Sequence, residues 1–244
     1  YEYIKYPSKN LILGGISNDV NYIDSLTTHT MYPDSDVYTR SKPTNVGPSY
    51  TTARNDASVD VIGGTTIRMM HSVTLLKGSY GYTYYRGFMM FDISSIWTPH
   101  VYEGKLTVTS NGSYGDMTPR ADGGKHLIAI CSSSAGSSVS TSEGQAFNRS
   151  VRYMVDDHYT SYGRGVYFNS GSNETTDITL NNTALSNLKY ENRFDVSVQE
   201  GASDFKGATY QGVYTGGSNP YTYGFNIYSE DYTGTSRDPV LEFK

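Results

Sequence analysis

Cysteine and clustered positive charge are what this sequence most clearly lacks. Only one of its 244 residues is a cysteine, Cys131, so neither a disulfide nor a cysteine-based zinc site can form within one chain. Lys and Arg total 19 against 24 acidic residues, the net charge is −5, and no basic block occurs. Binding to nucleic acid needs clustered positive charge, so we expect no nucleic-acid partner. An anionic membrane surface is disfavoured for the same reason.

Long apolar runs and helix-forming residues are also scarce. No stretch of about 18 apolar residues occurs, so we expect no transmembrane span and no membrane insertion. Lys, Glu, Leu and Ala are few, whereas the sequence has 24 Tyr and 25 Gly. Tyrosine favours strands and glycine favours turns, so the composition predicts an all-β fold of short strands joined by many turns.

The pattern along the chain predicts one β domain preceded by an arm. Residues 1–33 hold short apolar pieces between polar stretches, and we interpret them as an N-terminal arm or first strands. In residues 34–244, runs with β-type alternation recur between Gly, Pro, Asn and Ser clusters. Because no helical crossovers separate these runs, they predict an antiparallel β-sandwich with long loops. The sequence begins at Tyr1 without a signal-peptide pattern, so we expect a mature or partial chain.

Individual elements follow from the same pattern. Strands are predicted at 37–40, 58–62, 66–76, 82–93, 102–109, 126–131, 165–169, 176–180, 194–199, 223–229 and 240–243. One helical turn is predicted at 181–188 and a second short helix at 145–155. Cys131 ends an apolar strand, so we expect a buried thiol and not a nucleophile.

Two motifs carry a family resemblance. Residues 84–96 read YYRGFMMFDISSI, and residues 228–243 read YSEDYTGTSRDPVLEF. Shorter pieces accompany them in order, at 51–55, 104–108 and 178–181. Together they resemble the DNRLRE-type domain, which is similar to carbohydrate-binding module family 96. That family occurs in disaggregatase-related surface proteins, and related patterns occur in structural proteins of phages and archaeal viruses. The resemblance implies a jelly-roll β-sandwich over about residues 36–243.

Tyrosines in one long loop are the predicted binding residues. Compared with the family pattern, the segments 132–142 and 200–220 are extended. Tyr210, Tyr214 and Tyr221 lie in and beside the second of these, which is rich in Gly, Ser and Tyr. Tyrosine offers a rigid, flat face for a sugar ring or a protein partner at low entropic cost. A merely solvated loop is the alternative interpretation of the same residues.

Arg86 and Asp92 belong to the first motif, and we interpret both as structural. Their spacing of six places them on the same face of one strand. A charge or hydrogen-bond anchor at the edge of the sandwich would account for both residues without any catalytic role.

Two acidic clusters have spacings that could suit a metal. Asp34 and Asp36 form a D-x-D pair, which suits a hard cation such as Ca²⁺ in a loop, although no EF-hand pattern follows it. Asp156, Asp157 and His158 are adjacent, and adjacent residues on a strand point to opposite faces. We predict no cofactor, with Ca²⁺ bound in one of the long loops as the alternative, and the sequence does not locate such a site.

The preferred function is a non-enzymatic structural protein exposed on a virion surface, as a capsid decoration or a tail or fibre component. Its expected partners are other virion or surface proteins, contacted through the arm, together with host glycans and further copies of the chain in a homo-oligomer. The alternative is a carbohydrate-binding module of a secreted or cell-surface protein. A polysaccharide-degrading enzyme ranks third, because no G-x-S-x-G motif and no distinctive pair of carboxylates is present.

Overall fold

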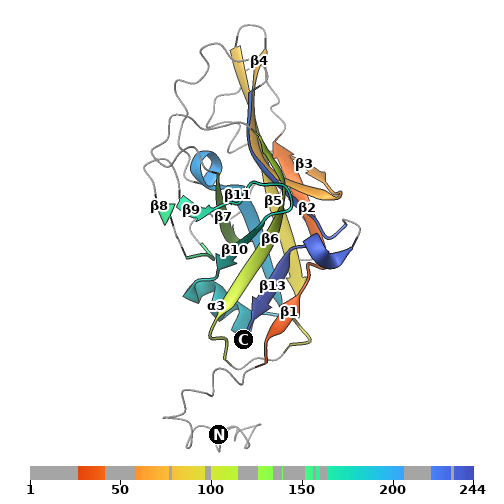
Figure 1. Ribbon diagram of the computed structural model, residues 1–244, viewed down its shortest axis with the longest axis vertical. Coiled ribbons are helices and arrows are strands. Elements are labelled where there is room, and N and C mark those ends of the chain that lie inside the picture. The colour runs from red at the N-terminus through yellow and green to blue at the C-terminus, as the bar shows by residue number, and fades with distance from the viewer. Residues whose placement is uncertain are drawn as a thin grey trace, which may run out of the picture.

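The protein is built almost entirely from antiparallel β-strands, as seen in a computed structural model (Figure 1). The predicted all-β fold class is therefore confirmed. The structure describes residues 27–41, 59–76, 79–96, 100–114, 126–133, 139, 152–155, 158–159, 164–205, 221–231 and 234–244. Within these ranges, one α-helix is present, and no helix is long and apolar enough to cross a membrane.

Every strand predicted beyond residue 34 is present, with ends shifted by a few residues. In chain order the strands are β1 (His29–Met31), β2 (Ser35–Ser41), β3 (Val59–Ile62), β4 (Thr66–Leu76), β5 (Ser79–Asp92), β6 (Gly104–Tyr114), β7 (Leu127–Ser132), β8 (His158–Tyr159), β9 (Arg164–Tyr167), β10 (Thr175–Thr179), β11 (Arg193–Glu200), β12 (Tyr221–Tyr228) and β13 (Val240–Phe243). The helix is α3 (Asn182–Tyr190), and two short turns are a π-helix, Gly201–Phe205, and a 3-10 helix, Thr235–Arg237.

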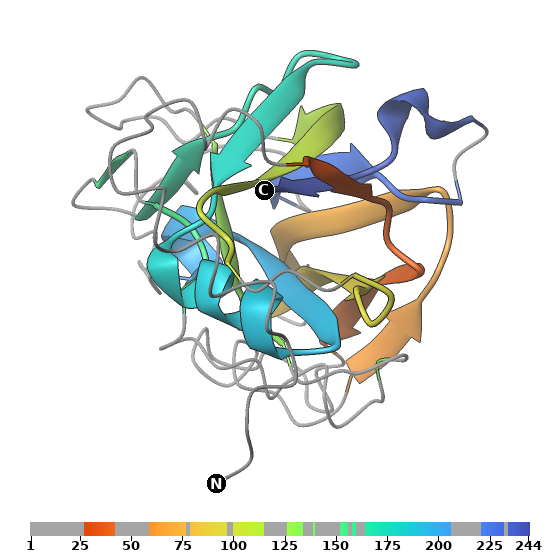
Figure 2. The same cartoon turned by 90° about the horizontal axis from the view of Figure 1, so that it is seen from below.

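The strands form one sheet that curls on itself. Its main path runs β1-β13-β6-β12-β4-β5-β11-β7-β9-β8, while β10 pairs with β6, and β2 pairs with β5 and β3. The first half of β6 pairs with β13 and β10, and its second half pairs with β12 across an irregular register. Seen from below, the strands surround a common interior (Figure 2). This arrangement is consistent with a β-sandwich, and the finer jelly-roll topology stays a prediction.

The core lies between β6, β10 and β13 on one side and β5, β7 and β11 on the other. Side chains alternate between the two faces of each strand, and those on the inner face form the core. Leu106 of β6 and Ile178 of β10, for example, are paired and fully buried. On the opposite side, the ring of Phe194 lies 6.4 Å from that of Phe91 and 5.1 Å from that of Tyr153. Such ring contacts add to the free energy gained by burial alone.

Helix α3 closes the lower end of this core (Figures 1 and 2). It begins where the Asn181 side chain accepts hydrogen bonds from the backbone N–H groups of Thr183 and Ala184. Ala184 and Leu188 are buried. The predicted helical turn at 181–188 is therefore confirmed, and the helix continues to Tyr190.

The predicted helix at 145–155 is wrong for the residues that the structure describes, 152–155. Arg152 and Met154 form isolated β-bridges with Cys131 and Leu180. Extended backbone lets Tyr153 and Met154 both enter the core, because the segment lies between β7 and the end of β10. Cys131 is buried in β7, as predicted.

Part of the predicted arm belongs to the sheet. Strand β1 lies within residues 1–33 and pairs with β13, with His29 opposite Phe243. The His29 ring stacks on that of Phe243 at 5.3 Å. Residues 1–26 lie outside the described residues, so the predicted boundary at residue 33 stays a prediction.

Candidate functional site

The predicted binding tyrosines fall largely outside the described residues. Tyr210 and Tyr214 lie in 206–220, which the structure does not describe. Tyr221 is the first residue of β12, where its backbone pairs with Val73 of β4. That register places Tyr221 toward the end of the molecule where the β4–β5 hairpin extends (Figure 1).

Arg86 takes part in a buried ion pair with a residue that the sequence did not suggest. Its Nε lies 2.6 Å from Asp204 Oδ2, and its Nη2 lies 2.8 Å from Asp204 Oδ1. The two side chains are only 6% and 2% exposed. Asp204 sits in the π-helical turn after β11, and just before this turn the Glu200 carboxylate accepts a hydrogen bond from the Ala202 N–H. A bidentate pair of this kind fixes the turn against β5, which fits a structural role for Arg86.

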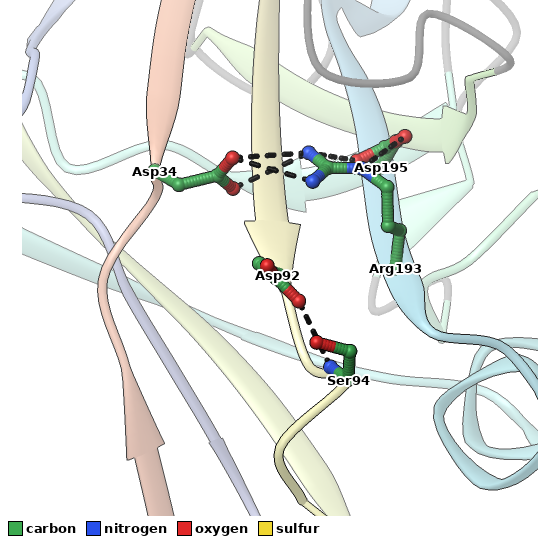
Figure 3. Close-up of polar contacts among 5 residues, drawn as sticks. All are labelled: Asp34, Asp92, Ser94, Arg193 and Asp195. Carbon is green, nitrogen blue, oxygen red and sulfur yellow. Dashed lines mark hydrogen bonds and ion pairs between the residues drawn. The ribbon is translucent and has the colours of Figure 1, made fainter.

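Asp92 stands at the exposed end of β5, beside a second polar group (Figure 3). Its carboxylate accepts a hydrogen bond from the Ser94 N–H at 2.9 Å. Hydrogen bonds from Ser94, together with the charge of Arg193, lower the pKa of Asp92. Arg193 itself lies between Asp34 and Asp195, 3.3 Å from each carboxylate. These contacts hold the end of β5 and the start of β11 beside the start of β2.

A carboxylate cluster, defined here as Asp36, Glu230, Asp231 and Asp238, lies where β2 meets the β12–β13 connection. Asp36 Oδ2 accepts a hydrogen bond from the Glu230 N–H at 2.8 Å. Burial, opposed by this hydrogen bond and reinforced by the charges of the other three acids, raises the pKa of Asp36 to about 7. Burial likewise raises the pKa of Glu230 and of Asp238.

The two predicted acidic motifs have different outcomes. Asp34 and Asp36 do not form one cation site. Asp34 is paired with Arg193, whereas Asp36 accepts a hydrogen bond from the Glu230 N–H. Asp156 and Asp157 lie outside the described residues, and His158 begins the short strand β8. Where the structure describes the chain, no group of three or more His, Cys, Asp or Glu side chains is placed so that it could hold a metal ion.

A pocket opens at the lower end of the sheet, at the first residue of β6 and the last residues of the chain. Its volume is about 320 Å³. It is lined by Thr28, Glu103, Gly104, Lys105, Thr179, Glu242, Phe243 and Lys244. Hydrogen bonds to Glu242 and Asp177 raise the pKa of Lys105, so its ammonium group stays charged. Beside the pocket, the ring of the exposed Tyr102 stacks on His100 at 5.9 Å. Nothing in the sequence analysis predicted this pocket, because its residues come together from four separate segments.

Comparison with known proteins gives no family. No protein-family model matches this sequence, and no curated protein matches it significantly.

Proposed function

We propose that the chain is a non-enzymatic structural protein exposed on the surface of a virion, as a capsid decoration or a tail component, with a glycan-adhesive role. The proposal extends the resemblance of residues 84–96 and 228–243 to DNRLRE-type domains. The geometry that supports it best is that β1 and β13 lie together at one end of the described domain and the β4–β5 hairpin extends from the other end.

The described chain enters and leaves the domain at one end. His29 of β1 pairs with Phe243, and Thr28 and Lys244 line the same pocket. At the other end, the β4–β5 hairpin extends to the top of the molecule, and its pairing continues to Leu76 and Ser79 (Figure 1). A module attached through its N-terminal segment would thus present the hairpin and the start of β12 outward.

Particle incorporation tests the structural role. In particles purified from a producing culture, the full chain is expected at a fixed stoichiometry with density that follows the particle symmetry. Deletion of residues 1–26 should reduce incorporation at least tenfold, whereas Tyr190→Ala, which changes an exposed residue of α3, should incorporate normally. Detection of the full chain only as a free secreted monomer would refute the proposal.

A carbohydrate-binding module of a secreted protein is the second candidate, and the pocket beside Tyr102 favours it. An aromatic ring next to charged hydrogen-bonding groups is a common arrangement for holding a polar ligand. Glycan binding measured on an array and by calorimetry separates the two roles. A distal adhesive surface predicts that Tyr221→Ala weakens binding about five- to thirtyfold and that Tyr102→Ala does not, since losing an aromatic contact of this kind costs about 1–2 kcal/mol. The opposite result would favour the second candidate.

A further inference from the structure

Two buried aspartates in the carboxylate cluster have oxygen atoms without a hydrogen-bond partner. Asp36 is 4% exposed and Asp238 is 7% exposed. The Oδ1 atoms of both are buried and accept no hydrogen bond. Burying a carboxylate without compensation is costly, so buried acids are normally paired with a cation or hydrogen-bonded.

The acids around Asp36 come from different parts of the chain. Asp36 belongs to β2, Glu230 and Asp231 follow β12, and Asp238 ends the 3-10 turn before β13. Asp34 lies just before β2 and adds its charge to those that act on Glu230. Negative charge is therefore concentrated where the start of β2 meets the connection between β12 and β13.

Three arginines on neighbouring segments make contacts with groups outside the cluster. Arg193 pairs with Asp34 and Asp195. The guanidinium of Arg237 lies over the ring of Tyr228, 5.1 Å from its centroid, and donates to its hydroxyl. Arg68 lies over the ring of Tyr38 at 5.6 Å.

We infer that the carboxylate cluster binds a divalent cation, with Ca²⁺ as the best match, through Asp36 and Asp238. Ca²⁺ takes six to eight oxygen ligands in flexible geometry, and these include backbone carbonyls and water as well as carboxylates. Among the described residues, no three His, Cys, Asp or Glu side chains are placed to hold a metal. The proposed site needs only two aspartates for charge, because neutral oxygens supply the other ligands. Mg²⁺ is a poorer match, because it demands stricter octahedral geometry and loses its water reluctantly.

Binding at this position would join β2 to the β12–β13 connection. In the structure, the Glu230 N–H to Asp36 hydrogen bond already spans this junction. A cation would add a second link and neutralise the mutual repulsion of the acids, so it would stabilise the folded chain over the unfolded one.

Terbium luminescence and thermal unfolding of the full chain test the site directly. Tb³⁺ replaces Ca²⁺ in oxygen sites, and Tyr38 and Tyr228, each two residues from a member of the cluster, can sensitise its emission. In protein first treated with EDTA, Ca²⁺ should raise the melting temperature by roughly 5 °C or more at saturation and displace bound Tb³⁺. Mg²⁺ should do so at least tenfold less effectively.

Single amide substitutions locate the binding. Asp36→Asn and Asp238→Asn should each weaken Ca²⁺ and Tb³⁺ binding at least tenfold, and Asp177→Asn, the same change at an exposed residue of β10, should leave both unchanged. The inference is overturned if the wild-type chain shows no response at millimolar Ca²⁺, or if both cluster variants bind as the wild type does. Stabilisation by acid without any response to Ca²⁺ would also overturn it, and would assign the cluster to a shared proton.

Discussion

Replacing Arg86 with methionine is expected to lower the free energy of unfolding by about 3–5 kcal/mol. The substitution removes the guanidinium that holds both oxygens of Asp204 at 2.6 and 2.8 Å. It leaves a carboxylate that is 2% exposed without its cation, and desolvation then opposes its charge. Denaturant unfolding followed by circular dichroism at pH 7 measures the loss.

Two controls separate this effect from the loss of any ion pair. Arg40→Met removes a pair of similar length, 2.7 Å to Asp60, from a side chain that is 45% exposed. That change should cost no more than about 1 kcal/mol, because exposed pairs contribute little. The double variant Arg86→Met/Asp204→Leu should recover most of the stability, since it removes both charges. If Arg86→Met costs as little as Arg40→Met, the pair does not fix the turn after β11.

The strands could be predicted from the sequence because alternation and turn residues are local signals. In β10, Thr176 and Ile178 are buried between exposed neighbours, which is the alternation of a strand with one face toward the core. In β11 both faces are buried: Ser197 lies between the buried Val196 and Val198 and is itself fully buried. Ser197 pairs with Phe88 of β5, which is also fully buried, so this part of the sheet is covered on both faces. A period-2 pattern cannot reveal a second buried face that carries polar residues.

The polar partners could not be predicted, because they depend on contacts between distant segments. Arg86 was singled out in the sequence, but Asp204 lies 118 residues away in an irregular turn that has no periodic signal. The D-x-D spacing drew attention to Asp36, yet it suggested Asp34 as its companion. The structure instead sets Asp36 against Glu230, which is 194 residues away. In the sequence, Glu230 and Asp238 were only parts of the terminal motif. Nothing there showed that the fold would bury them close to Asp36.

The metal-free protein is expected to lose stability as the pH rises from about 4 to about 7. Asp36 has a pKa of about 7 in the folded chain and an ordinary value of 3.8 when unfolded. Between these values the folded chain holds a proton that the unfolded chain has released, so stability falls with rising pH. The full difference corresponds to about 4 kcal/mol from Asp36 alone. Asp92 has the opposite effect on stability, because its pKa is lowered in the folded chain. Its contribution is lost as the pH falls below its ordinary pKa, and so it acts only in more acidic solution.

Asp36→Asn isolates this contribution, because the amide resembles the protonated acid in shape and carries no charge. In EDTA at pH 8 the variant should be more stable than the wild type by up to about 4 kcal/mol, and the advantage should vanish near pH 4. Denaturant unfolding at four pH values between 4 and 8 measures the difference, with Asp177→Asn as the control on an exposed acid of β10. A variant less stable than the wild type at pH 8 in EDTA would show that Asp36 is stabilised as an anion by the protein itself. Saturating Ca²⁺ should narrow the difference at pH 8, since the wild type alone keeps the carboxylate that the cation requires.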